Sequence, residues 1–213
     1  MSHTYVLYYA QGAASLCVHW MLIDAKATHE IKSVDITTGQ NKQDAYLKIN
    51  PRGLIPTLMI DGVAHYETAA LMMLLSEHYP QYAPAVGSPA RGVWLELIVH
   101  CANVLAPMMR DWYYADKEAP AGHADAIKDI ARERVERAWA RFDDILSDGR
   151  VYLADNKLTA LDFLATMYMR WARNMPKPPT AWPNVNRYVQ HMRSLQSFAT
   201  LNQREGLTEW MNA

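Results

Sequence analysis

The sequence predicts a two-part fold, an α/β domain followed by an all-helical domain. Two observations lead to this prediction. Up to residue 80, short β-rich runs alternate with helical periodicity, whereas after residue 87 only helical patterns remain. The chain has 213 residues, half of them apolar, which suffices for one large domain or two small ones. We therefore expect a first domain over residues 1–80, a linker over 81–87 and a helical domain over 88–213.

The first domain begins with a strand, a helix and a second strand. Small residues between the first strand and the helix form a turn, and Asn50-Pro51 ends a further short helix. A strand–helix–strand order implies a parallel pair with a right-handed crossover. The expected elements are a strand at Tyr5–Tyr9, a turn at Gly12–Ser15, a helix at Leu16–Ala27, a strand at Ile31–Ile36 and a short helix at Gln43–Ile49.

A hairpin and a helix complete this domain. Asp61-Gly62 joins two β-rich runs, Thr57–Ile60 and Val63–Tyr66, and this dipeptide is typical of an antiparallel hairpin. Apolar residues then recur at helical spacing until Pro80 stops the helix. The predicted order is βαβαββα, a small mixed sheet with helices packed on it.

The second part shows helix signals only. Ser88-Pro89 starts a helix that runs to about Asp116, and an apolar stripe from Ile127 to Ile145 is closed by Gly149. Thr159 and Asp162 have the spacing of a capping box, which predicts a helix from there to about Met175. A further helix begins near Pro183.

Composition and motifs exclude several classes of function. Net charge is −1 with mixed charges, which argues against a nucleic-acid-binding stripe. The first residues match neither a secretory signal nor a membrane span. Two cysteines without a CxxC pattern favour a reducing cytoplasm, and the eight histidines have no metal-ligand spacing, so no metal is expected.

Four segments of the chain carry a recognisable pattern: YYAQGAASLCVHWML, INPRGLIPTL, YETAAL and LTALDF. In this order they resemble the corresponding segments of the soluble glutathione transferases, and the opening segment resembles that of the bacterial members. The resemblance implies a thioredoxin-like fold for the first domain.

The resemblance implies that glutathione is the co-substrate and that the Ile55-Pro56 bond is cis. In the family, the backbone N–H and C=O of the residue before this proline pair with the cysteinyl part of glutathione, as a strand edge binds a peptide. Leu54, Ile55 and Pro56 are therefore expected to bind glutathione. The alternative is a cis-proline turn with a purely structural role.

Glu67 and Thr68 stand where a strand passes into a helix. Free N–H groups and the positive end of the helix dipole favour a carboxylate there, and Glu67 can accept a bond from an ammonium group. The γ-glutamyl end of glutathione carries both groups, and a plain helix start with an acidic neighbour is the alternative. For the glycyl carboxylate, Gln40, Lys42 and Gln43 are the available partners, and a solvated loop without a ligand is the alternative.

A hydroxyl near a helix N-terminus can stabilise the glutathione thiolate. Ser15, at the expected start of the first helix, is the first choice for this catalytic role, and Tyr8 is the runner-up. Tyr8 and Tyr9 point to opposite faces of their strand, so only one of them can reach the site. Ala14 stands where bacterial members carry a cysteine, which puts mixed-disulfide chemistry in doubt.

An electrophile pocket is expected in the helical domain, and a homodimer is expected from the family. Core packing is the alternative role for each of the pocket residues, which are Met108, Met109, Trp112, Tyr113 and Trp171.

The predicted function is conjugation of the glutathione thiolate to a small apolar electrophile by a cytoplasmic detoxification enzyme without a metal. β-Ether cleavage, dehalogenation and isomerisation are alternatives within the family. A non-catalytic binding module is the alternative outside it, since the same fold occurs in proteins that catalyse nothing.

Overall fold

The computed structural model describes residues 3–210, and contacts divide the chain into two compact units. The first unit holds the residues up to Tyr79 together with those from Arg193 on, and the second unit is Pro80–Met192. The helical domain expected over residues 88–213 is therefore too long at its end. Helix α9 (Gln196–Glu205) packs against α1 (Leu16–Asp24), which places it with the sheet.

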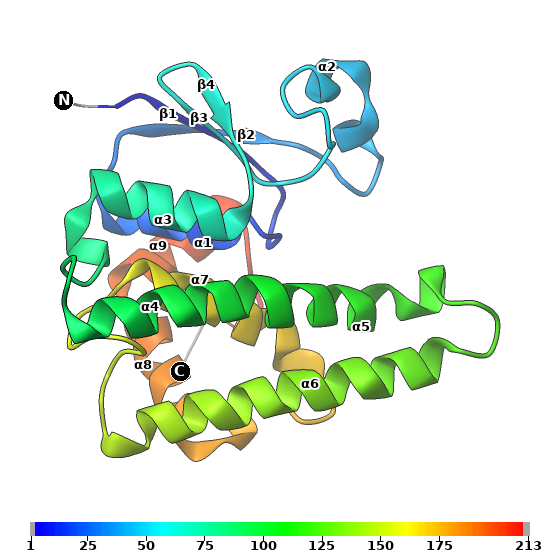
Figure 1. Ribbon diagram of the computed structural model, residues 1–213. Coiled ribbons are helices and arrows are strands. Elements are labelled where there is room, and N and C mark those ends of the chain that lie inside the picture. The colour runs from blue at the N-terminus through cyan, green and yellow to red at the C-terminus, as the bar shows by residue number, and fades with distance from the viewer. Residues whose placement is uncertain (1–2, 211–213) are drawn as a thin grey trace. The chain divides into compact units, whose positions relative to one another are not determined.

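The first unit contains a four-stranded mixed sheet in the order β2-β1-β3-β4 (Figure 1). β1 (Tyr5–Tyr9) pairs parallel with β2 (His29–Ser33) and antiparallel with β3 (Thr57–Ile60). β3 pairs antiparallel with β4 (Val63–His65) across Asp61 and Gly62, which both have positive φ, as a tight hairpin turn requires. The predicted parallel pair and hairpin are both confirmed.

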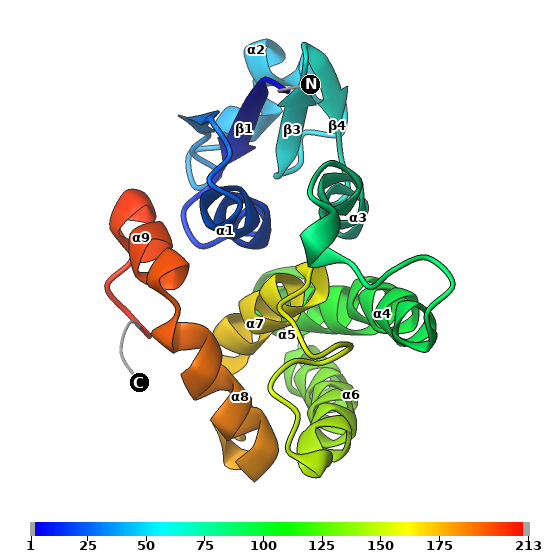
Figure 2. The ribbon, with the colours of Figure 1, turned by 90° about the vertical axis from the view of Figure 1, so that its left-hand side faces the viewer.

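Helices cover the sheet on both sides. α1 and α3 (Thr68–His78) lie on one face, α9 lies beside α1, and α2 (Asp44–Leu47) lies on the other side (Figure 2). The alternation of β1 explains these layers, because the ring of Tyr9 lies 5.9 Å from that of His19 on α1. The ring of Tyr8 lies 5.9 Å from that of Tyr46 on α2.

Several predicted boundaries in this unit are wrong. The short helix is Asp44–Leu47 and the second hairpin strand ends at His65, and two further elements differ for a local reason. α1 ends at Asp24 instead of Ala27, because Lys26 adopts a left-handed φ of 53° and stops the helix. The second strand is His29–Ser33 rather than Ile31–Ile36. The carboxylate of Asp35 accepts bonds from the N–H groups of the two threonines that follow Ile36, and this turn ends the strand early.

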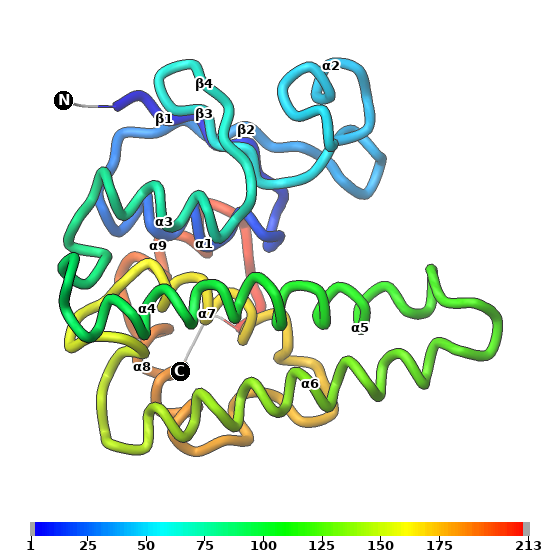
Figure 3. Tube along the Cα trace, viewed as in Figure 1, coloured from blue at the N-terminus to red at the C-terminus, as the bar shows by residue number. Residues whose placement is uncertain are grey.

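The second unit is helical. α4 (Pro89–His100), a π-helical segment at Cys101–Leu105 and α5 (Ala106–Glu118) form one long helix that runs antiparallel to α6 (Ala124–Ile145) (Figure 3). Pro107 accounts for the π segment, because proline has no N–H to bond the carbonyl four residues earlier. The predicted helix start at Pro89 is confirmed, and the helix ends two residues beyond the predicted Asp116.

The predicted capping box is present at the start of α7 (Ala160–Trp171). The buried carboxylate of Asp162 accepts bonds from the Thr159 N–H and hydroxyl, each at 2.8 Å. It also accepts the Leu153 N–H at 3.0 Å and the Tyr188 hydroxyl at 3.1 Å. Burial raises the pKa of Asp162, and these four donors oppose the rise. α8 (Pro183–Ser194) begins where the sequence predicts, whereas α9 was not predicted.

The helix Pro89–Glu118 is long and apolar enough, by length and composition alone, to cross a membrane. The core helix of a soluble protein can meet the same criteria. Here the helix packs against α6 and α7 in the second unit, so its composition is explained as that of a bundle helix.

Candidate functional site

The loop between α2 and β3 is held in place by two buried side chains. The Tyr46 hydroxyl donates to the Leu54 carbonyl at 2.7 Å and lies 2.9 Å from the Thr57 hydroxyl. The Asn50 amide donates to the same two oxygens, at 2.8 and 3.0 Å. Burial raises the pKa of Tyr46, so this hydroxyl stays protonated and available as a donor at neutral pH. These hydrogen bonds fix the residues on either side of the Ile55-Pro56 bond, Leu54 and Thr57.

Replacing Tyr46 by phenylalanine is expected to lower the free energy of unfolding by about 1–2 kcal/mol, because the Leu54 carbonyl and the Thr57 hydroxyl each lose a partner and keep only the Asn50 amide. The control is Tyr113→Phe, whose side chain is 66 % exposed and which should leave stability unchanged. Urea unfolding of both variants measures the difference. Equal midpoints for Tyr46→Phe and the original protein would contradict the supporting role of the hydroxyl.

The peptide groups of Ile55 are available to a ligand. Its bond to Pro56 is cis, and neither its N–H nor its C=O makes a hydrogen bond to any residue in the range 3–210. Ile55 is half-buried, while Leu54 beside it is 55 % exposed. An accessible donor and acceptor on one residue can pair with an extended peptide-like ligand in the manner of an added strand.

The 3-10 turn Gln40–Lys42 packs against this loop at Gly53. The Asn41 amide and the Lys42 ammonium group donate to the Gly53 carbonyl at 2.8 and 3.1 Å. Gly53 has a φ of 61°, and a Cβ there would lie 2.6 Å from the Asn41 carbonyl oxygen, so only glycine fits. Lys42 therefore lies beside the loop that carries Ile55. The Gln40 side chain instead accepts the Asp35 N–H at 2.6 Å, away from that loop.

The start of α3 presents polar groups to solvent. Glu67 has a positive φ of 67°, which a non-glycine residue adopts only when its surroundings impose it. Within the described chain, the first N–H groups of α3, those of Thr68, Ala69 and Ala70, have no partner. The Glu67 carboxylate pairs with the Arg52 guanidinium at 2.5 Å, and both side chains are largely exposed. The site can thus accept a carboxylate at the helix end and a cation beside it.

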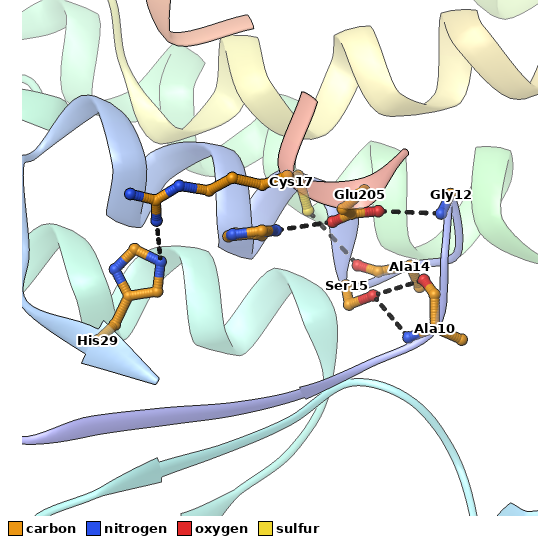
Figure 4. A network of polar contacts seen from close by, with 9 residues as sticks. Ala10, Gly12, Ala14, Ser15, Cys17, His29 and Glu205 are labelled. Atoms are coloured by element: carbon orange, nitrogen blue, oxygen red, sulfur yellow. Dashed lines mark hydrogen bonds and ion pairs between the residues drawn. The ribbon is translucent and has the colours of Figure 1, made fainter. Parts of the chain in front are cut away.

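The turn after β1 comes next to this helix end, since the Thr68 hydroxyl donates to the Ala14 carbonyl at 3.5 Å. Ser15 is fully buried at the N-cap of α1. Its hydroxyl donates to the Ala10 carbonyl at 3.2 Å and accepts the Ala10 N–H at 3.3 Å (Figure 4). Among residues 3–210, the N–H groups of Ala14 and Ser15 bond to nothing, so the helix end presents backbone donors at its first turn.

The structure therefore brings Ile55, Glu67, Thr68 and the turn of Ser15 into one unit. Tyr8, the alternative hydroxyl, lies against Tyr46 on the α2 side of the sheet, with the Lys32 ammonium group 5.7 Å from its ring. Its side chain leaves β1 on the opposite face from α1.

The expected pocket residues of the second unit differ in burial and in their contacts. Met109 is only 4 % exposed and belongs to the core. Met108 and Trp112 share one face of α5, one turn apart, and Trp112 borders an open hollow with α6 residues. Tyr113 is exposed and packs edge-on against Tyr114, while Trp171 pairs with Tyr168. Over residues 3–210, no three His, Cys, Asp or Glu side chains are grouped as metal ligands.

Sequence reasoning missed the side chains that support the site. Arg52 occupies the variable position of its motif, and Tyr46 and Asn50 come from a short helix and its end. Glu205, which bonds the turn of Ser15, comes from α9. The helical spacing of Glu205 from Phe198 and Leu201, which places it on the buried face of α9, was the one available signal.

An α/β unit with an open backbone position, followed by a helical unit, defines a class of two-domain proteins, and comparison with known families makes this class specific. Residues 14–78 match the family described as glutathione S-transferase, N-terminal domain. Residues 99–196 match glutathione S-transferase, C-terminal domain. The chain belongs to the glutathione S-transferase family.

Individual relatives are similar to this chain over most of its length. Glutathione S-transferase GST-4.5 of Xanthomonas campestris pv. campestris is 25% identical over 209 residues, covering 94% of this chain and 98% of the relative. Maleylacetoacetate isomerase of Dictyostelium discoideum is 24% identical over 200 residues, covering 91% and 90%. A sphingomonad glutathione S-transferase solved with glutathione has a TM-score of 0.80 and 26% identity, covering 95% of this chain and 100% of that one.

Proposed function

We propose that this protein is a cytoplasmic glutathione transferase that joins the glutathione thiolate to a small apolar electrophile. The observation that carries the proposal is the unpaired backbone N–H and C=O of Ile55, in the same unit as the open N-terminus of α3. These groups match the cysteinyl backbone and the γ-glutamyl carboxylate of the tripeptide. The sphingomonad relative solved with glutathione supports the choice of ligand.

In this proposal each end of glutathione has its own partner. The unpaired N–H groups at the start of α3 bind the γ-glutamyl carboxylate, and the Glu67 carboxylate binds the γ-glutamyl ammonium group. The glycyl carboxylate takes the Lys42 ammonium group, while Gln40, whose side chain is bonded to Asp35, is the weaker choice. The sulfur then lies over the first turn of α1.

The thiol must lose its proton to react, and the α1 N-terminus favours the resulting anion. Ser15 is our choice for the hydroxyl that donates to the thiolate, which requires this hydroxyl to turn from Ala10 to the sulfur. Ala14 takes the position of the bacterial cysteine, so the protein would work without a mixed disulfide.

The experiment is binding to immobilised glutathione followed by conjugation of a chloronitrobenzene. Ser15→Ala should lower kcat/KM by at least about tenfold, since a hydrogen bond to an anion is lost. Tyr8→Phe is the matched control and should leave kcat/KM within about twofold, because Tyr8 faces α2. Activity that survives Ser15→Ala but disappears in Tyr8→Phe would assign the role to Tyr8. A protein that does not bind at millimolar glutathione is a non-catalytic member of the fold.

The electrophile would contact the exposed part of α5, where Met108 and Trp112 share a face. A homodimer is part of this proposal, and it would cover the exposed apolar side chains of α4 at Val93, Leu95 and Val99. Isomerisation is the second candidate reaction, favoured by the match to a maleylacetoacetate isomerase over most of the chain. Assay with maleylacetoacetate and catalytic glutathione separates isomerisation from conjugation.

A further inference from the structure

A buried carboxylate from α9 holds the turn that precedes α1. The Glu205 side chain is fully buried, and each of its oxygens has one donor. Oε1 lies 2.8 Å from His19 Nδ1, and Oε2 accepts the Gly12 N–H at 3.0 Å (Figure 4). The Gln11 amide adds a bond to the Gly206 carbonyl at 3.0 Å. The end of α9 is thus bonded to two successive residues of this turn and to α1.

The tautomer of His19 follows from its surroundings. Its Nε2 is buried and has no partner within residues 3–210, so a hydrogen there would be an unpaired buried donor. This places a hydrogen on Nδ1, which donates to the Glu205 carboxylate. His19 is enclosed by the ring of Tyr9 and by the ring of His29, whose pKa is lowered by burial. A buried carboxylate is costly unless it is hydrogen-bonded, and here it accepts two N–H donors.

The bonded turn is the one that forms the thiol side of the proposed site. It contains Ala14 and Ser15, whose N–H groups have no partner in the described chain. Ser15 fixes the turn from within by accepting the Ala10 N–H, a bond that can persist while its hydroxyl donates to the sulfur, and Thr68 bonds the turn to α3. The third attachment is Glu205, and it comes from a helix far along the chain.

We propose that Glu205 is a positioning residue for thiol activation. This proposal rests on the proposed function. The carboxylate fixes the Gly12 peptide, and with it the direction in which the first N–H groups of α1 point at the sulfur. Glu205 would then affect the acidity of bound glutathione without contacting it, while the γ-glutamyl end at α3 is unaffected.

The test compares Glu205→Gln with Ser197→Ala. Glutamine keeps the shape, but it can no longer accept from both N–H groups through charged oxygens. Ser197 accepts the Trp20 indole N–H at 2.9 Å, which is another bond between α9 and α1 that does not reach the turn. Three quantities are measured: amide hydrogen exchange of Gly12, the pKa of bound glutathione from thiolate absorbance, and kcat and KM.

For Glu205→Gln we expect about tenfold faster exchange at the Gly12 amide, because its hydrogen bond to the Glu205 carboxylate is lost. The pKa of the bound thiol should rise and kcat should fall, with the KM for glutathione nearly unchanged. Ser197→Ala should leave all of these as they are. Unchanged Gly12 exchange and thiol pKa in Glu205→Gln, or the same changes in Ser197→Ala, would overturn the proposal.

Two further results distinguish a failure of the role proposed for Glu205 from a failure of the proposed function. If Glu205→Gln does not fold, Gln11→Ala removes the neighbouring exposed bond and should speed Gly12 exchange to a smaller extent. An unchanged rate in Gln11→Ala would then count against the proposal. If the original protein does not bind glutathione, the proposed function is wrong, and the exchange rates still decide whether Glu205 orders the turn.

Discussion

Replacing Glu67 by glutamine is expected to weaken glutathione binding by about tenfold, because a carboxylate that accepts the ligand's ammonium group becomes a neutral amide. Stability should not change measurably, because the side chain is exposed and its ion pair with Arg52 lies at the surface. Isothermal titration with glutathione gives the affinity, and thermal unfolding gives the stability.

Arg52 supplies the matched control for this prediction. Its guanidinium holds the Glu67 carboxylate, so it competes with the ammonium group of the ligand. Arg52→Gln should therefore leave the affinity equal or improve it. If Arg52→Gln weakens binding as much as Glu67→Gln, then Arg52 itself contacts the ligand, and the assignment of Glu67 as the ammonium acceptor is wrong.

Replacing Asp162 by alanine is expected to lower the free energy of unfolding by about 3–5 kcal/mol, the largest stability effect that we predict. The change leaves the buried donors of Leu153 and Thr159 without an acceptor, removes one of the two acceptors of the Tyr188 hydroxyl, and removes one half of the capping box of α7. Denaturant unfolding followed by circular dichroism measures the loss.

The control for Asp162 lies in the segment that joins α6 to α7. In that segment, Asp155 has the same side chain and accepts one exposed bond from the next N–H, so Asp155→Ala should change stability by less than about 0.5 kcal/mol. A similar loss of stability in both variants would show that the stability does not depend on the buried carboxylate of Asp162.

The parts of the fold that the sequence predicts have signals within a few residues. Pro89 at a helix start, Asp61-Gly62 in the hairpin and the Thr159–Asp162 box each determine backbone geometry directly, and each is found in the structure. The break between α8 and α9 falls at Leu195 without a glycine or proline. Only its extended backbone ends the helix, so periodicity alone would not find it.

The candidate site also has residues that a local sequence signal predicts and residues that no local signal predicts. The motif around Ile55, Glu67 and Thr68 is visible because consecutive residues share one function. Glu205 and Gly12 meet across 193 positions, and the pairing of distant residues leaves no local pattern to read. The burial of Ser15 was likewise unpredictable, since a serine at a helix start reads the same whether its hydroxyl faces solvent or the chain.

The assignment of α9 to the first unit has a consequence for biosynthesis. Pro80–Met192 is one continuous segment, so it can make all its internal contacts as soon as Met192 has left the ribosome. The sheet is made first, but α1 receives its partner helix only after residue 205 has been added. The half of the protein that is synthesised first is therefore the half that is completed last, because α1 lacks its α9 partner until then.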